Sequence, residues 1–351
     1  MPMKSAIFKF IRFLVIILVL AGLTAAKFNP KAARRFLVRG QYAAMNGAYK
    51  TALKHLNRAI LIQPGYDTAY YHRGVLKSSV QDINGAIADF SQAVRLNPDF
   101  SLAYFGRGTL YLQHGQQQKA LADFDAAIQI NPRFYDALNN KAVLLNAMGR
   151  APQARQIYDS LIATYEALSS KKENQHTWSL TQHQTDTYRS YLALKPRVPR
   201  LYFNRSFIKA QGQDLEGAIA DLDKALYFNP YDYAAYYQKG EVLVQLEQYK
   251  AALQAFEKAR SLRPTAFYGH LNLGKAYVAA GQSRKAIVIF NQAIRRNQRS
   301  GEAYYLRGSE RLKQRKMEQA YSDLRLAKIL GYSAAAEKLQ QLDALSRKNQ
   351  F

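Results

Sequence analysis

Apolar and small residues recur along this chain with a period of 34 residues. Residues 69–98 and 103–132 show the pattern most clearly, because they are similar position for position after a shift of 34. Within each period, an alanine, an aromatic residue or leucine, and a second alanine follow one another at spacings of four and three, and only Leu161 departs from this pattern. These spacings place the three residues on one face of an α-helix. A helical face that repeats at a fixed interval is typical of a solenoid.

Small residues occupy two columns of the repeat and indicate how the helices of one unit pack. The glycine column includes Gly74 and Gly108. The alanine column, twelve residues further on, includes Ala86, Ala120, Ala252 and Ala286. A glycine inside a helix costs about 1 kcal/mol relative to alanine, so its recurrence in one column indicates the close approach of a second helix. These columns are therefore predicted to be structural, and the aromatic residue or leucine fills the space between the two helices.

Prolines mark the ends of the units. One series consists of Pro64, Pro98 and Pro132, and a second of Pro196, Pro230 and Pro264. Because proline cannot continue a helix, each unit is predicted to be a helix pair that ends just before this position. The second series is shifted relative to the first, which indicates one break in the array.

The repeats and the break divide the chain into five predicted regions. They are an apolar N-terminal segment over 1–26, a first array of four repeats over 27–168, a degenerate repeat or linker over 169–198, a second array of four repeats over 199–332, and a capping helix with a tail over 333–351. The polar stretch 169–187 is predicted to be the most mobile internal segment. Two short helices cannot bury their apolar faces alone, so the core is expected to come from stacking of neighbouring units.

These columns of glycine, alanine, aromatic residue, alanine and proline resemble the tetratricopeptide repeat family, and the resemblance covers residues 33–332. It implies an all-α fold, a right-handed superhelical solenoid of antiparallel helix pairs with one degenerate unit and a C-terminal capping helix. It also implies that the first helix of each pair lines a concave groove for protein partners.

Large side chains mark the residues that the resemblance would place in that groove. They are Tyr71, Phe105, Asn139, Phe203, Tyr237 and Tyr305 in one column, with Phe207 four residues after Phe203. An aromatic stripe of this kind can hold an extended peptide or a helix by its side chains. The alternative is that these rings pack between adjacent repeats.

The N-terminal segment combines basic residues with an apolar run. Residues 13–26 carry no charge, with Lys4, Lys9 and Arg12 before them and Lys27 after them. As a helix, residues 7–26 would span about 30 Å, which matches the hydrocarbon core of a bilayer. We favour an uncleaved single-span membrane anchor over a cleaved signal peptide or a buried helix. Basic residues on both flanks leave the orientation ambiguous, and we favour a repeat body outside the cytoplasm, in the periplasm or cell envelope.

The chain is strongly basic, with 50 Lys and Arg against 25 Asp and Glu and a formal net charge of +25. Residues 1–66 contain no acidic residue. Such an excess predicts attraction to an anionic partner such as phospholipid, a polyanionic polymer, nucleic acid or an acidic protein. The alternative is a basic surface that is simply solvated.

Catalytic motifs are missing from the sequence. It contains no phosphate-binding GK[ST] loop, no HExxH and no nucleophile elbow, and it has no cysteine. His176 and His183 lie in the polar break without a nearby carboxylate cluster, and His72 and His270 lie on repeat helices, where packing or groove lining explains them. We predict no metal, no cofactor and no enzymatic activity.

The sequence therefore predicts a membrane-anchored scaffold that mediates protein–protein interactions through its groove. Two alternatives remain at this point: a helical-repeat protein that binds nucleic acid or another polyanion, and an accessory subunit of an envelope enzyme or export complex. Polyanion binding would weaken steeply with salt, because it releases counterions, whereas binding in an aromatic groove would not.

Overall fold

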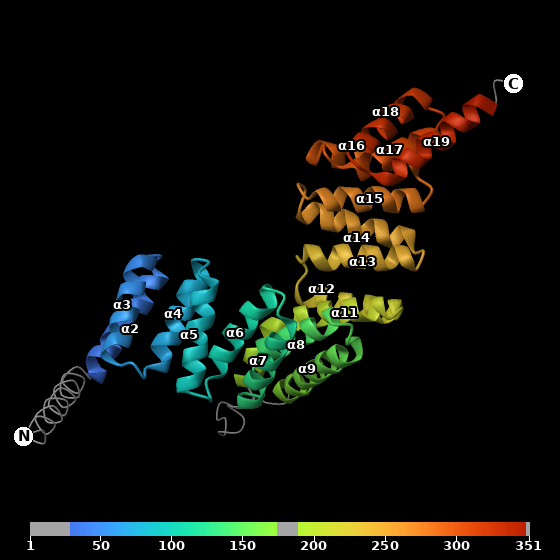
Figure 1. The fold of residues 1–351 in the computed structure, drawn as a ribbon. Helices are drawn as coiled ribbons and strands as arrows, with labels where there is room; N and C mark the ends of the chain where they lie inside the picture. Colours follow the sequence, from blue (N-terminus) through green and yellow to red (C-terminus); the bar gives the residue numbers. More distant parts are fainter. Residues whose placement is uncertain (1–28, 174–188, 349–351) are drawn as a thin grey trace, which may run out of the picture. The chain divides into compact units, whose positions relative to one another are not determined.

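A computed structural model of the chain describes residues 29–173 and 189–348, and it confirms the predicted all-α solenoid of helix pairs (Figure 1). Every regular element in these two ranges is helical. The chain divides into two compact units, residues 1–148 and 149–351. Within each unit, consecutive helices lie side by side, and the two helices of a pair are joined by a short turn.

The first unit contains seven described helices. They are α2 (Pro30–Met45), α3 (Tyr49–Ile62), α4 (Asp67–Ser79), α5 (Ile83–Leu96), α6 (Ser101–Gln113), α7 (Gln117–Ile130) and α8 (Tyr135–Ala147). Asn29 caps the first of them, since its side chain accepts a hydrogen bond from the backbone N–H of Ala32 at 2.9 Å.

The second unit begins with a helix that is longer than its counterparts. Its described helices are α9 (Ala151–Glu173), the short 3₁₀ helix η1 (Lys195–Arg197), α11 (Val198–Gln211), α12 (Leu215–Phe228), α13 (Tyr233–Gln245), α14 (Tyr249–Leu262), α15 (Phe267–Ala279), α16 (Ser283–Arg296), α17 (Gly301–Lys313), α18 (Met317–Ile329) and α19 (Ser333–Lys348). Residues 189–194 are also helical. The segment predicted to be most mobile lies mostly outside the described residues, which resume at residue 189. The C-terminal helix α19 packs against α18.

The small residues lie where the two helices of a pair touch. Ala86 and Ala252 are completely buried. A Cβ atom at Gly74 would lie 2.9 Å from Cε1 of Phe90, and one at Gly240 would lie 2.7 Å from Cε1 of Phe256. A larger side chain at Gly74 or Gly240 would therefore force the aromatic ring of the second helix to move.

The turn inside each pair places one residue in the left-handed region of the backbone. Glycine fills this position at Gly47, Gly115, Gly149 and Gly281, with φ between +71° and +76°. The other pairs use Gln81, Gln213, Glu247 and Arg315 at φ of 58° to 65°. Glycine adopts this conformation without steric cost, whereas a residue with a Cβ atom does not.

No helix in the described part of the chain is long and apolar enough to cross a membrane. The predicted anchor over residues 7–26 falls outside the described residues.

Candidate partner-binding site

The aromatic residues of the predicted groove in the first unit pack against their own repeat. The ring of Tyr71 lies 5.8 Å from that of Phe90 and 5.0 Å from that of Phe100. Phe105 makes the equivalent contacts, at 6.0 Å to Phe124 and 4.8 Å to Phe134. Each ring thus lies between the second helix of its pair and the turn that leads to the next pair. Such pairs of rings stabilise by about 0.5–1.5 kcal/mol beyond the area they bury.

These rings nevertheless keep part of their surface open to solvent. Tyr71 and Phe105 are half-buried, whereas Asn139, in the same column on α8, is only 7% exposed. Packing on one side holds each ring in a single orientation, so a partner that met the open side would order it at little entropic cost. Asn139 offers a partner much less surface than the two aromatic residues do.

In the second unit, a residue of the predicted groove column forms polar contacts with the neighbouring first helix. Tyr237 on α13 packs 5.8 Å from Phe256, and its hydroxyl is hydrogen-bonded to the side chain of Asn272 on α15. Asn272 also donates to Glu241, at 2.8 Å. Burial, together with the nearby Glu241 charge, raises the pKa of the Tyr237 phenol well above its usual range. Tyr237 therefore stays protonated and able to donate a hydrogen bond at any physiological pH.

An ion pair joins the next two first helices, α15 and α17. Nζ of Lys275 lies 2.6 Å from a carboxylate oxygen of Glu302. Tyr305 on α17 packs 5.0 Å from Tyr332, which follows the last pair. The first-helix face of the second unit is thus a mixed surface of aromatic rings, amides and one exposed ion pair.

Phe203 and Phe207 differ although both lie on α11. Phe203 packs beside the buried cluster that includes Ala218 and Leu222, whereas Phe207 is 48% exposed. Phe207 is therefore the predicted groove residue with the largest apolar surface available to a partner.

Two further exposed residues on this face were missed from the sequence. Leu102 on α6 is 45% exposed and Tyr268 on α15 is 66% exposed. Each lies three residues before the column that contains Phe105, and residues three apart share a helix face. The helical spacing could therefore have identified both.

An arginine–aspartate ladder joins each of four described helix pairs, here called the regular pairs, to the pair before it. Nε and a terminal nitrogen of Arg73 donate to the two carboxylate oxygens of Asp89 at 2.8 and 2.6 Å. The remaining terminal nitrogen donates to Asn57 of the preceding pair at 2.8 Å. The same arrangement recurs with the arginine and aspartate pairs Arg107 and Asp123, Arg205 and Asp221, and Arg307 and Asp323.

This ladder explains the recurring aspartates as structural. Asp89 is 3% exposed and accepts from two cations, since Lys77 lies 2.9 Å from its second oxygen. In the next pair, the hydrogen bonds to Asp123 raise the pKa of the Arg107 guanidinium. Bidentate pairs of this kind fix geometry as well as adding energy. The sequence did not reveal the ladder, because its partners are 16 residues apart on two antiparallel helices.

Metal-ligating groups do not cluster within the described residues, where no group of three or more His, Asp or Glu could hold an ion. His176 and His183 lie outside those residues.

A solenoid of helix pairs with these packing columns defines the class of the protein as a helical-repeat protein. Family models described as tetratricopeptide repeat match residues 111–167 and 243–309 in one case and 73–133 in another. The chain therefore carries tetratricopeptide repeats, which confirms the resemblance seen in the sequence. Proteins built from such repeats generally mediate protein–protein interactions. No curated protein matches the sequence.

Solved structures show the same fold at low sequence identity. PilW, described as a widely conserved type IV pilus biogenesis factor, is 19% identical with a TM-score of 0.54, and the match covers 68% of this chain and 96% of that one. PilF of Pseudomonas aeruginosa is 16% identical with a TM-score of 0.51, covering 68% and 94%. The Cut9–Hcn1 hetero-tetramer of the APC/C contains a chain that is 16% identical with a TM-score of 0.53, covering 84% and 52%. At these identities the likeness concerns the fold alone.

Proposed function

We propose that this protein is a scaffold that binds other proteins through the first-helix face of its repeats. The observation that carries the proposal is the combination of packed rings with exposed apolar residues on that face. In the second unit, Phe207 and Tyr268 belong to the same series of first helices as the half-buried Tyr237 and Tyr305. Rigid aromatic anchors flanked by polar groups are typical of binding hot spots.

The experiment begins with capture of partners by the full-length protein in non-ionic detergent, identified by mass spectrometry. Phe207→Ser and Tyr268→Ser are then tested against the identified partner. Tyr227→Ser is a matched control, because Tyr227 is 78% exposed but lies on the second helix α12. We expect the two first-helix variants to weaken binding about tenfold or more and the control to leave it unchanged. Equal binding by all three variants would contradict the proposal.

Salt dependence separates protein binding from the polyanion alternative. If the partner is a protein held by aromatic side chains, its affinity should change little between 50 and 200 mM salt. A polyanion held by six to ten lysine and arginine contacts would lose roughly 10³–10⁵ in affinity over the same range. A loss of that size would favour the alternative.

We further propose that residues 7–26 anchor the protein in a membrane, with the repeats outside the cytoplasm. The apolar run between basic flanks supports this proposal. Because the chain has no cysteine, a single Gln319→Cys substitution on the exposed side of α18 provides a unique label. A membrane-impermeant maleimide should label it in cells with an intact inner membrane. Labelling only after lysis of that membrane would place the repeats in the cytoplasm, and release of the protein by salt alone would exclude the anchor.

A further inference from the structure

The pair formed by α15 and α16 departs from the ladder at three positions. In the four pairs that carry the ladder, the first helix has a tyrosine and, three residues later, an arginine, as at Tyr70 and Arg73. In α15 these positions hold His270 and Leu273, and the aspartate of the second helix is replaced by Ile289. The glycine, alanine and aromatic columns are present in this pair as Gly274, Ala286 and Phe290. The three replacements therefore change only the contacts with the preceding pair.

In a regular pair, the tyrosine and arginine occupy the space between successive second helices. The guanidinium of Arg73 lies 5.3 Å from the centre of the Tyr70 ring while it bonds Asn57 and Asp89. Leu273 is completely buried, and its apolar side chain cannot form a hydrogen bond to the preceding pair. Glu257, which occupies the column of Asn57, instead accepts from Arg260 on its own helix, at 2.6 and 2.9 Å.

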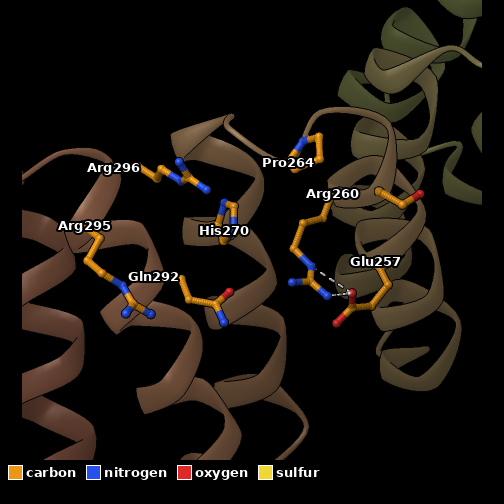
Figure 2. Close-up of a pocket in the computed structure, with 8 residues that line it drawn as sticks. Glu257, Arg260, Pro264, His270, Gln292, Arg295 and Arg296 are labelled. Carbon is orange, nitrogen blue, oxygen red and sulfur yellow. Dashed lines mark hydrogen bonds and ion pairs between the residues drawn. The ribbon is translucent and has the colours of Figure 1, made fainter.

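A pocket of about 620 Å³ lies at this site (Figure 2). It is lined by α14, α15 and α16 through Glu257, Arg260, Pro264, His270, Arg295 and Arg296, among others. In Figure 2, Arg260 and Arg296 lie on opposite sides of His270, and Arg295 lies beside Gln292. Nδ1 of His270 donates to the carbonyl oxygen of Ala266 at 2.9 Å, which fixes the ring at the pocket wall.

The lining of the pocket has an excess of positive charge. Three arginines face one glutamate, and that glutamate is paired with Arg260. Arg295 and Arg296 form no hydrogen bond or ion pair with any residue that the structure describes. Both are exposed, so each guanidinium is free to turn toward a ligand.

We propose that this pocket binds a phosphate group with two negative charges. Arginine suits such a group, because its planar fork donates two parallel hydrogen bonds to phosphate oxygens and keeps its charge at any physiological pH. The two unpaired guanidinium groups match the two charges of inorganic phosphate or of a phosphomonoester. The site is separate from the proposed protein-binding face, since second helices supply most of its lining.

Last-turn arginines also stabilise helix C-termini without binding any ligand. Arg95 provides the matched control for that role. It occupies the same column as Arg295, in the last turn of α5. There Tyr70 and Arg73 fill the corresponding space and Arg95 is bonded to Gln92 at 2.5 Å.

The test is calorimetric titration of the full-length protein, in non-ionic detergent and about 150 mM sodium chloride to screen exposed charges, with inorganic phosphate. We expect binding that the Arg295→Gln/Arg296→Gln variant weakens about tenfold or more and that Arg95→Gln leaves unchanged. His270→Tyr, which restores the side chain of the regular pairs, should weaken binding as well, and circular dichroism checks that each variant is folded. Equal loss in Arg95→Gln, or no loss in the double variant, would overturn the proposal.

Competition experiments identify the source of the phosphate. A phosphoserine peptide that binds more tightly than inorganic phosphate supports a phosphorylated protein as the ligand, and equal binding supports the free ion. A phosphodiester carries a single charge per phosphate, so it should compete weakly. Competition by a phosphodiester as strong as that by phosphoserine would contradict the assignment of a doubly charged group.

Discussion

The two helices of the pair α4–α5 and the two helices of the pair α15–α16 pack against each other through the same residue types. Gly74 and Gly274 occupy one column, and each faces an aromatic ring, Phe90 or Phe290. Ala86 and Ala286 are both completely buried. The contact between the two helices of a pair therefore follows the same rule in both.

The two pairs differ in how each is linked to its predecessor. The first uses Arg73 and Asp89 to reach the preceding pair, whereas the second has Leu273 and Ile289 at those positions and a basic pocket beside them. Packing within a pair and linkage between pairs are thus separate features of the repeat. A helix pair can therefore keep its fold without the arginine–aspartate link, and the space of that link can then form a basic pocket.

The largest effect is expected from Asp89→Ala. It leaves Arg73 and Lys77 facing each other without their shared carboxylate, and removal of one partner from a largely buried ion pair costs about 3 kcal/mol. Thermal denaturation should show a clear loss of stability. A change of less than about 0.5 kcal/mol, typical of an exposed site, would show that the ladder contributes little.

The same ladder can be transplanted into α15 and α16. Ile289→Asp alone should destabilise the protein, because it places a carboxylate at a site that is 7% exposed without a cation to pair with it. Adding Leu273→Arg should recover part of the loss. If the loss of unfolding free energy in the double variant equals the sum of the losses in Ile289→Asp and Leu273→Arg, the two positions do not couple.

The shared columns should respond alike in the two pairs. Ala86→Leu and Ala286→Leu each insert bulk where two helices touch, and each should cost about 1–3 kcal/mol. Thermal melts of both variants measure the loss. A large loss in one pair with none in the other would contradict a common packing rule.

The smallest effect is expected at the turns. Glu247→Gly should stabilise the protein by about 0.5–1 kcal/mol, because Glu247 has φ of 58° and glycine adopts that conformation without strain. Gly115→Ala should destabilise by a similar amount, since Gly115 has φ of 71°. A lower melting temperature for Glu247→Gly would indicate that the glutamate side chain makes a contribution of its own.

The sequence was sufficient to predict the fold because every unit repeats the same local rules. The glycine and alanine columns, the aromatic filler and the terminal proline act within one helix pair, so their spacing carries the information. The positive φ at Gln81 and Glu247 was not predicted, because neither residue type marks a left-handed turn as glycine does.

The binding surfaces were less predictable, because they depend on contacts between units. Tyr71 packs against Phe100, a turn residue whose position beside the groove column appears only after folding. His270 and Leu273 are visible as departures in the sequence, but their consequence depends on what Tyr70 and Arg73 touch in a regular pair. Residues that look equivalent in one column can thus differ in exposure, as Phe203 and Asn139 do.

Site-specific photocrosslinking tests the central claim, that the first-helix face binds protein partners, most directly. A photoreactive phenylalanine derivative would replace Phe207 or Tyr268 on the first helices, and Tyr227 on the second helix α12, in the full-length protein in cells. All three sites are exposed, at 48%, 66% and 78%. Our account predicts a discrete crosslinked protein from Phe207 and Tyr268 and none from Tyr227. Crosslinks from Tyr227 alone would contradict it and move the binding surface to the second helices.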